Sequence, residues 1–202
     1  MKAKILETLP NDRHSFEEVD YAEIHVVDWK NIDNTRGIEI FNVTQSNIKS
    51  VCIFNENKIK VAFDKFGENA LPISKGVQAE QCECIAFPSG SNEKIWILAI
   101  ETKYANNEDA AFRIKADQNY PQKMVSQIVS TVDYLRAKSI IDEEQQVHAI
   151  ISFPELVSDF NSTLFSYVKE EWSIENLIVN KKIRIKGCNS AKITSGKGIK
   201  LL

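Results

Sequence analysis

The chain has 202 residues, of which 43% are hydrophobic and 26% charged, and its formal net charge at pH 7 is −3. With only 7 glycines and 5 prolines, this composition is typical of a globular domain with a buried core and excludes a low-complexity or collagen-like chain. The longest apolar run, residues 95–100, is too short to span a bilayer, and residues 1–10 lack the apolar stretch of a signal peptide. We therefore expect a single cytoplasmic domain that has no membrane partner.

Residues 1–76 are predicted to contain a helix followed by a β-hairpin. Glu18 follows Ser15 at the spacing of a capping box, which predicts a short helix that begins at about Phe16. Residues 21–29 fit either a helix or a strand. Alternating and apolar segments then predict three strands, with a hairpin turn at Asn55–Asn57 between the last two: residues 38–43, 50–54 and 58–63.

Residues 77–175 are predicted to form the core of the sheet. Turn-forming residues 88–92 separate the segments 81–87 and 94–104, so we expect two neighbouring, hydrogen-bonded strands. The second of these strands contains an uninterrupted apolar run, which indicates that it is covered on both faces at the centre of the sheet. Three elements follow in the chain: an amphipathic helix over 119–138, a buried strand over 147–153 and a second helix over 156–168. This order predicts an α/β fold with a central mixed β-sheet flanked by helices.

Residues 176–202 form a basic tail, which contains seven lysine or arginine residues and no acidic residue. We expect basic strands in this tail, separated by Gly187 and Gly196. A basic segment on an otherwise acidic chain can contact a polyanion such as nucleic acid, but lysines also protect edge strands from aggregation, and the sequence leaves both roles open. The residues predicted to contact nucleic acid are Lys181, Lys182, Arg184 and Lys186.

The cysteines and histidines form no metal-binding pattern in the sequence. Cys82 and Cys84 are two residues apart, but neither a second pair nor a nearby histidine completes a zinc site. We expect both to be core residues, since free cysteine is among the most buried residue types. The three histidines are far apart in the chain: His14, His25 and His148.

The strand predicted over 94–104 ends in an acid-x-lysine sequence, Glu101-Thr102-Lys103. Residues two apart on a strand share a face, so Glu101 and Lys103 are expected to project together. Glu83 is a lone acid in the preceding strand, and it lies near Glu101 if the two strands are neighbours. Two adjacent carboxylates repel unless a cation lies between them, and carboxylate oxygens favour Mg²⁺ or Mn²⁺.

This arrangement resembles the PD-(D/E)XK nuclease superfamily, in which an acid on one strand precedes an acid-x-lysine sequence on the next strand and a helix that carries glutamine. The resemblance implies a restriction-endonuclease-like fold. It also implies that Glu83, Glu101 and the main-chain carbonyl of Thr102 bind Mg²⁺ or Mn²⁺, which activates water and polarises the phosphate. Lys103 would then position the nucleophile, and Gln127 would orient water or a phosphate oxygen, although Gln127 also fits a plain solvated helix position.

The resemblance covers residues 81–153, and within them the sequence departs from the family's pattern. The first acid is glutamate rather than the more frequent aspartate, and no proline precedes it. Glu80 competes with Glu83 for the role of the first acid. Some members of the family have a further acid on a leading helix, for which this sequence offers three candidates: Glu17, Glu18 and Glu23.

The sequence therefore predicts a metal-dependent DNA endonuclease, in a defence, mobile-element or repair context, whose basic tail binds the nucleic-acid backbone. A homodimer is expected by analogy, because cutting both strands is simpler with two sites. One alternative is a catalytically inactive binding module of the same fold that acts as a subunit of a larger complex. The other is an unrelated α/β protein whose tail only protects a sheet edge.

Overall fold

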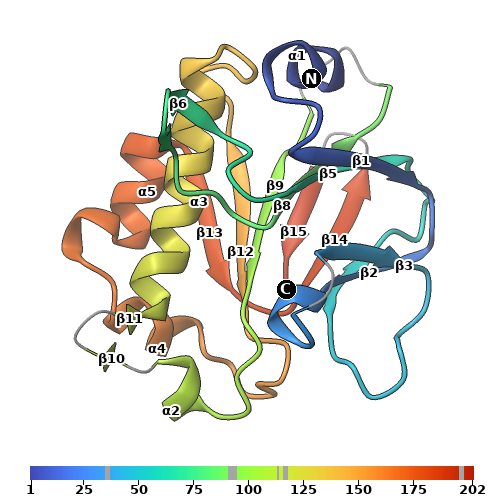
Figure 1. The fold of residues 1–202 in the computed structure, drawn as a ribbon. Helices are drawn as coiled ribbons and strands as arrows, with labels where there is room; N and C mark the ends of the chain where they lie inside the picture. Colours follow the sequence, from blue (N-terminus) through green and yellow to red (C-terminus); the bar gives the residue numbers. More distant parts are fainter. Residues whose placement is uncertain (35–36, 91–94, 113, 116–117, 196–197) are drawn as a thin grey trace.

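The computed structural model describes residues 1–34, 37–90, 95–112, 114–115, 118–195 and 198–202. Within these residues the chain is a mixed α/β protein with two mixed β-sheets and a few helices (Figure 1). No helix in this part of the chain is long and apolar enough to cross a membrane.

The described strands fall into two large sheets and two small ones. The first sheet has the strand order β1 (His14–Val19), β5 (Val61–Phe66), β8 (Cys84–Pro88), β9 (Leu98–Thr102), β12 (Val147–Ser152) and β13 (Ile183–Gly187). The second has the order β15 (Gly198–Leu201), β14 (Ser190–Ser195), β4 (Val51–Phe54), β2 (Glu23–Asp28) and β3 (Ile38–Phe41). The small sheets pair β6 (Pro72–Ser74) with β7 (Val77–Gln78), and β10 (Ile114–Lys115) with β11 (Gln118–Asn119).

The helices are short except for one long helix, α3. In chain order they are α1 (Lys2–Thr8), α2 (Glu108–Ala111), α3 (Tyr120–Ala137), α4 (Asn161–Ser166) and α5 (Ile174–Lys181), with 3-10 helices η1 (Trp29–Asn31) and η2 (Glu170–Trp172). The side chain of Asn119 caps α3 by accepting a hydrogen bond from the Gln122 main-chain N–H at 3.1 Å, and Pro121 lies in the first turn as predicted.

The helices cover one face of the first sheet, and the second sheet covers the other face (Figure 1). Just before and within β9, Ile97 and Ala99 pack in the apolar cluster that contains the helices, whereas Leu98 and Ile100 pack in the cluster that contains the second sheet. The predicted sheet flanked by helices is therefore correct for one face only. Strands from the N-terminal part and from the basic tail pair with one another, and their apolar side covers the remaining face.

Strand β9 lies at the centre of the first sheet, as the sequence predicted. Ile100 is opposite Cys84 of the antiparallel strand β8 and opposite Ile150 of the parallel strand β12. All five residues of β9 are buried. The parallel pairing needs a crossover connection, which α3 provides between β9 and β12.

The helix predicted from Phe16 is wrong, because residues 14–19 form strand β1, which pairs with β5. Glu18, the acid that suggested a capping box, instead forms ion pairs with the Lys2 Nζ at 2.7 Å and the Lys60 Nζ at 2.8 Å. The first helix is α1, which lies nearer the N-terminus. Residues 21–29, which fitted either element, contain β2 and the start of η1.

The hairpin predicted around Asn55 is also wrong, because β4 belongs to the second sheet and β5 to the first. The fully buried Asn55 side chain explains the difference. Its Nδ2 donates to the carbonyls of Tyr21 at 2.9 Å and Ile59 at 2.8 Å, and its Oδ1 accepts from the Ile59 N–H at 2.9 Å. These bonds stabilise a loop that carries the chain from one sheet to the other.

The tail begins with α5 and then forms three strands, so its prediction as β-structure is correct from β13 onward. Gly187 is the last residue of β13, where an added Cβ would lie 3.1 Å from the Cα of Asn161. The second predicted helix is shorter than expected and corresponds to α4. Three parts of these predictions lie outside the described residues: Gly196, residues 91–92 of the predicted turn, and residue 94, the first of the segment 94–104.

We predict that Asn55→Ala lowers the free energy of unfolding by about 2–3 kcal/mol, because it leaves two partly buried carbonyls and one N–H without their side-chain partner. Urea denaturation at neutral pH measures this change. Asn57→Ala is the matched control, since Asn57 is exposed in the same loop and its replacement should change stability by less than about 0.5 kcal/mol. Equal effects of the two substitutions would contradict the role given to Asn55.

Candidate functional site

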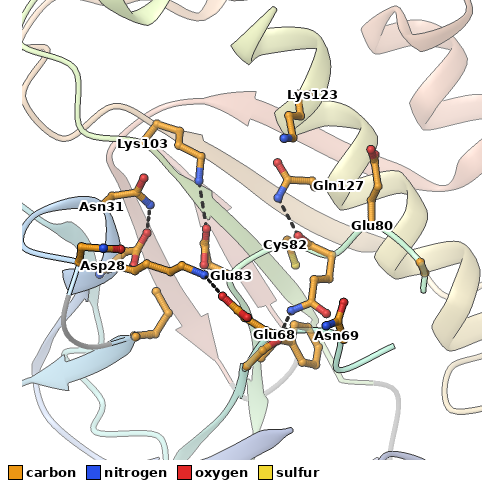
Figure 2. Close-up of a pocket in the computed structure, with 18 residues that line it drawn as sticks. Asp28, Asn31, Glu68, Asn69, Glu80, Cys82, Glu83, Lys103, Lys123 and Gln127 are labelled. Carbon is orange, nitrogen blue, oxygen red and sulfur yellow. Dashed lines mark hydrogen bonds and ion pairs between the residues drawn. The ribbon is translucent and has the colours of Figure 1, made fainter. Parts of the chain in front are cut away.

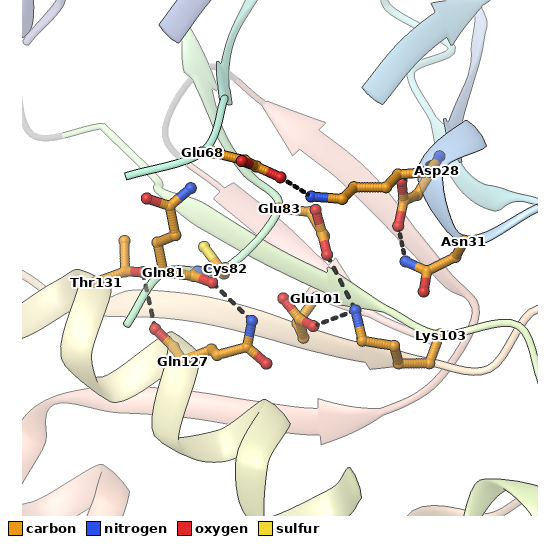
Figure 3. A network of polar contacts seen from close by, with 11 residues as sticks. Asp28, Asn31, Glu68, Gln81, Cys82, Glu83, Glu101, Lys103, Gln127 and Thr131 are labelled. Carbon is orange, nitrogen blue, oxygen red and sulfur yellow. Dashed lines mark hydrogen bonds and ion pairs between the residues drawn. The ribbon is translucent and has the colours of Figure 1, made fainter. Parts of the chain in front are cut away.

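Glu83, Glu101 and Lys103 come together at one end of the central strands (Figure 3). The Lys103 Nζ lies 3.1 Å from Glu83 Oε1 and 3.1 Å from Glu101 Oε1. The Glu83 N–H donates to the Ile100 carbonyl at 3.1 Å, which continues the register of β8 and β9 and places Glu83 opposite Glu101. The three side chains that the sequence singled out thus converge as expected.

The pairing of β9 with β12 positions the lysine. The Lys103 N–H donates to the Ser152 carbonyl at 3.0 Å, so the extended backbone continues beyond the last residue of β9. Lys103 therefore shares a face with Glu101, on the side of the helices, while the buried Thr102 side chain faces the second sheet. The Thr102 carbonyl, the predicted main-chain metal ligand, belongs to the peptide unit between Thr102 and Lys103.

Glu101 is the most strongly perturbed acid of this group. Its side chain is fully buried, and burial raises the pKa of Glu101 to about 8, with Lys103 opposing the shift and Glu83 adding to it. Its Oε2 has no hydrogen-bond partner among the described residues. Burial lowers the pKa of Lys103, but the charges of Glu101 and Glu83 outweigh this effect and raise it, so the ammonium stays protonated.

Asp28 contributes a third carboxylate that the sequence did not identify. It is fully buried at the end of β2, where it accepts hydrogen bonds from the Lys30 N–H at 3.0 Å and from the Asn31 side chain. Burial and then the charge of Glu83 raise the pKa of Asp28 to about 6, against the effect of Lys103. Because Asp28 belongs to the second sheet, only the packing of the two sheets brings it to the site.

The acids that the sequence proposed for this third position lie elsewhere. Glu17 forms an ion pair with Lys65 on the surface of β1 and β5. Glu18 pairs with lysines of α1 and of the segment before β5, and Glu23 lies near His25 at the start of β2. Glu80 contacts the Ser126 hydroxyl of α3 rather than Lys103, so Glu83 is the acid that joins the cluster.

Gln127 and Thr131 of α3 hold the segment that leads into Glu83 (Figure 3). The Gln127 Nε2 donates to the Gln81 carbonyl at 2.8 Å, and the Thr131 Oγ1 accepts from the Cys82 N–H at 2.9 Å. The Gln127 Oε1 is buried and has no hydrogen-bond partner among the described residues. Gln127 is therefore a positioning residue in this structure, and its predicted contact with water or phosphate stays a prediction.

A pocket of about 870 Å³ opens above the cluster, between α3 on one side and the end of β2 with η1 on the other (Figure 2). Asp28, Glu83, Lys103 and Gln127 line it, together with residues of the segments 66–69 and 79–83. Lys123, one helical turn before Gln127, also lines the pocket, so cationic and anionic groups face the same space.

The basic tail residues do not join this cluster. Lys181 pairs with Asp133 at 2.7 Å, and Lys182 lies 3.7 Å from Glu144. Both precede β13, beside the start of β9 rather than its end. The remaining two, Arg184 and Lys186, alternate with the helix-facing residues of β13 and so lie on the face opposite Glu101. Their predicted contact with nucleic acid stays a prediction, on a surface separate from the acids.

The cysteine prediction is confirmed, because Cys82 and Cys84 are both buried and burial raises the pKa of each thiol.

Comparisons with known protein families, with curated proteins and with solved structures found no match for this chain. A functional assignment therefore depends on the geometry and electrostatics of the cluster itself.

We predict that Glu101→Gln stabilises the protein at pH 8. Since the pKa of Glu101 is raised from 4.5 to about 8, the folded protein binds this proton more tightly than the unfolded chain, and stability falls as pH rises from about 4.5 to 8. The variant removes this loss, so its free energy of unfolding should exceed that of wild type by on the order of 2 kcal/mol at pH 8 and by little at pH 5.

Urea denaturation at both pH values checks this expectation, with the exposed Glu143→Gln as the matched control, which should follow wild type. Identical pH dependence of wild type and Glu101→Gln would show that the buried carboxylate is not the group that titrates.

Proposed function

We propose that the protein is a metal-dependent nuclease that hydrolyses phosphodiester bonds in DNA, with Glu83, Glu101 and Lys103 in its active site. The observation that carries this proposal is the convergence of both carboxylates on one ammonium group beneath an open polar pocket. Burying such charges is unfavourable unless they have partners, and groups that are retained despite this cost cluster at functional sites.

The order of the elements supports a restriction-endonuclease-like fold as part of the proposal. The strand that leads from Glu83, β8, and the acid-x-lysine strand, β9, are antiparallel neighbours. The glutamine-bearing helix α3 follows β9 in the chain and contributes to the apolar cluster on the same face as Glu101. Each feature of the resemblance thus has a counterpart in the arrangement of these elements.

The chemistry of the donor set suits a hard divalent cation, and side-chain movements would have to bring the three carboxylates together, because their oxygens do not all lie within 4.8 Å of one another. Asp28, Glu83 and Glu101 offer carboxylate oxygens, which Mg²⁺ and Mn²⁺ prefer, and the unpartnered Glu101 Oε2 needs compensation for its burial. These residues, with the Thr102 carbonyl, would hold the cation. When bound, the cation would supply a Lewis acid for the phosphate and a water of lowered pKa.

The remaining side chains have roles that their positions support. The Lys103 ammonium, which stays protonated, would neutralise negative charge that develops on the phosphate. Gln127 keeps the segment before Glu83 in place, and its free Oε1 is an acceptor for a water proton. Lys123 on the pocket wall offers a second positive charge to a phosphate group.

A second candidate function is a catalytically inactive binding module of the same fold. The observation in its favour is that Lys103 already contacts both carboxylates and therefore supplies the compensation that a metal ion would provide. In this case the ion cluster is a structural feature, and the pocket binds a ligand without hydrolysing it.

We predict that the protein cleaves plasmid DNA in the presence of Mg²⁺ or Mn²⁺, and that Glu101→Gln and Lys103→Ala each lower the rate by roughly 10²–10³-fold. The gel assay should include Glu143→Gln, prepared in the same way, as a control for copurified nucleases. Full cleavage by both site variants would remove the assignment of these residues. No cleavage by wild type, together with specific nucleic-acid binding, would favour the inactive module.

A separate prediction concerns the cation alone. Mg²⁺ at about 100 times its dissociation constant should raise the Tm by roughly 5–10 °C. The rise should increase from pH 6 to pH 8, because the raised pKa values of Asp28 and Glu101 mean that protons compete with the cation. Asp28→Asn and Glu101→Gln should each abolish the shift in a thermal-melt assay, whereas Glu143→Gln should retain it. An unchanged Tm in wild type at pH 8 would contradict a resident cation site.

A further inference from the structure

A second group of potential ligands lies on the outer face of the second sheet, away from the proposed active site. The antiparallel register of β2 and β4 places His25 directly opposite Cys52. Glu23 precedes His25 by two residues and so projects from the same face. Ile24 and Val26 of β2 alternate with them and pack in the core between the two sheets, which shows that Glu23 and His25 face outward.

The donor atoms of these three side chains are close enough to share one ion. One atom from each residue lies within 4.8 Å of the other two, and the His25 Nε2 is 3.6 Å from Glu23 Oε2. Bonds of about 2.0–2.3 Å in a tetrahedral Zn²⁺ site separate the ligand atoms by roughly 3.3–3.8 Å. Small rotations of the side chains are therefore enough to complete such a site.

The imidazole of His25 is already held in a suitable orientation. Its Nδ1 is 2.9 Å from the Ser50 Oγ, so the ring is fixed with Nε2 directed toward Glu23. Metal-binding histidines typically use their second ring nitrogen in this way, because the hydrogen bond selects the tautomer and the ring orientation. Ser50 precedes Cys52 by two residues and therefore belongs to the same outward-facing group.

The thiol is better suited to a ligand role than to that of a nucleophile. Burial, and then the negative charge of Glu23, raise the pKa of Cys52 to about 11, so the sulfur without a cation is a neutral thiol. Among the described residues it forms no disulfide. A positive ion between the imidazole and the carboxylate would favour the thiolate.

We propose that Glu23, His25 and Cys52 form a binding site for a transition-metal ion, Zn²⁺ foremost. Imidazole and thiolate ligands select Zn²⁺ over Mg²⁺ and Mn²⁺, which sets this site apart from the carboxylate cluster around Glu101. Three protein ligands leave one tetrahedral position for water or an external ligand. The exposed side chain of Glu23 keeps that position accessible from solvent. The proposal does not depend on nuclease activity.

Titration of the full chain with Co²⁺, in the presence of a phosphine reductant, tests the site directly. We expect a sulfur-to-cobalt charge-transfer absorption that saturates at one equivalent and is displaced by Zn²⁺. Cys52→Ser should abolish this absorption, while Cys188→Ser, which removes another free cysteine, should leave it in place. Glu101→Gln should also retain it, which separates this site from the proposed active site.

Glu23→Gln provides a variant whose folding is not in question, because the Glu23 side chain is 58% exposed. It should weaken the affinity for Zn²⁺ by about tenfold or more in a competition titration. The absence of the absorption in wild type, or its persistence in folded Cys52→Ser, would overturn the proposal. Unchanged Zn²⁺ affinity in Glu23→Gln would overturn the three-ligand site.

Discussion

The ion cluster of Lys103 with Glu83 and Glu101 is the constraint on which the centre of this protein depends. A fully buried carboxylate is strongly destabilising without a partner, and only a register that places Glu83 opposite Glu101 brings the ammonium between both acids. A one-residue slip of β8 against β9 would turn one acid to the other face of the sheet. The cluster therefore favours one register of these two strands.

The second sheet adds a further buried carboxylate to this arrangement, and its burial is unfavourable. It places Asp28 close enough to Glu83 and Lys103 for their charges to act on it, and burial raises the pKa of both Asp28 and Glu101. A core selected for stability alone would not gather acids in this way, because apolar residues of similar volume pack there at lower cost. Local destabilisation of this kind is typical of functional sites. The raised pKa values mean that the carboxylates lack enough positive charge around them, which a bound cation would supply.

Sequence patterns predicted the elements whose signals are local. The apolar run before Glu101 predicted a central strand, and the turn-forming residues after β8 predicted its partner, so three site residues followed from neighbouring segments. The third carboxylate and the site around His25 depend on pairings between distant segments, and no local pattern encodes them. The errors have the same origin: Ser15 to Glu18 has the spacing of a helix cap, but pairing with β5 satisfies its backbone instead.

The alternation of β2 explains how one strand can serve two different sites. Asp28 lies on its inner face and lines the pocket at the end of β9, whereas Glu23 and His25 lie on its outer face with a thiol opposite. Under the two proposals, the oxygen donors of the inner face would take Mg²⁺ or Mn²⁺, and the imidazole and thiol of the outer face would take Zn²⁺. For the proposed nuclease this geometry also decides where a substrate enters. Lys123 lines the pocket above the carboxylates, while Arg184 lies on the far face of the sheet, so the phosphate that reacts must approach between α3 and η1 rather than along the basic tail.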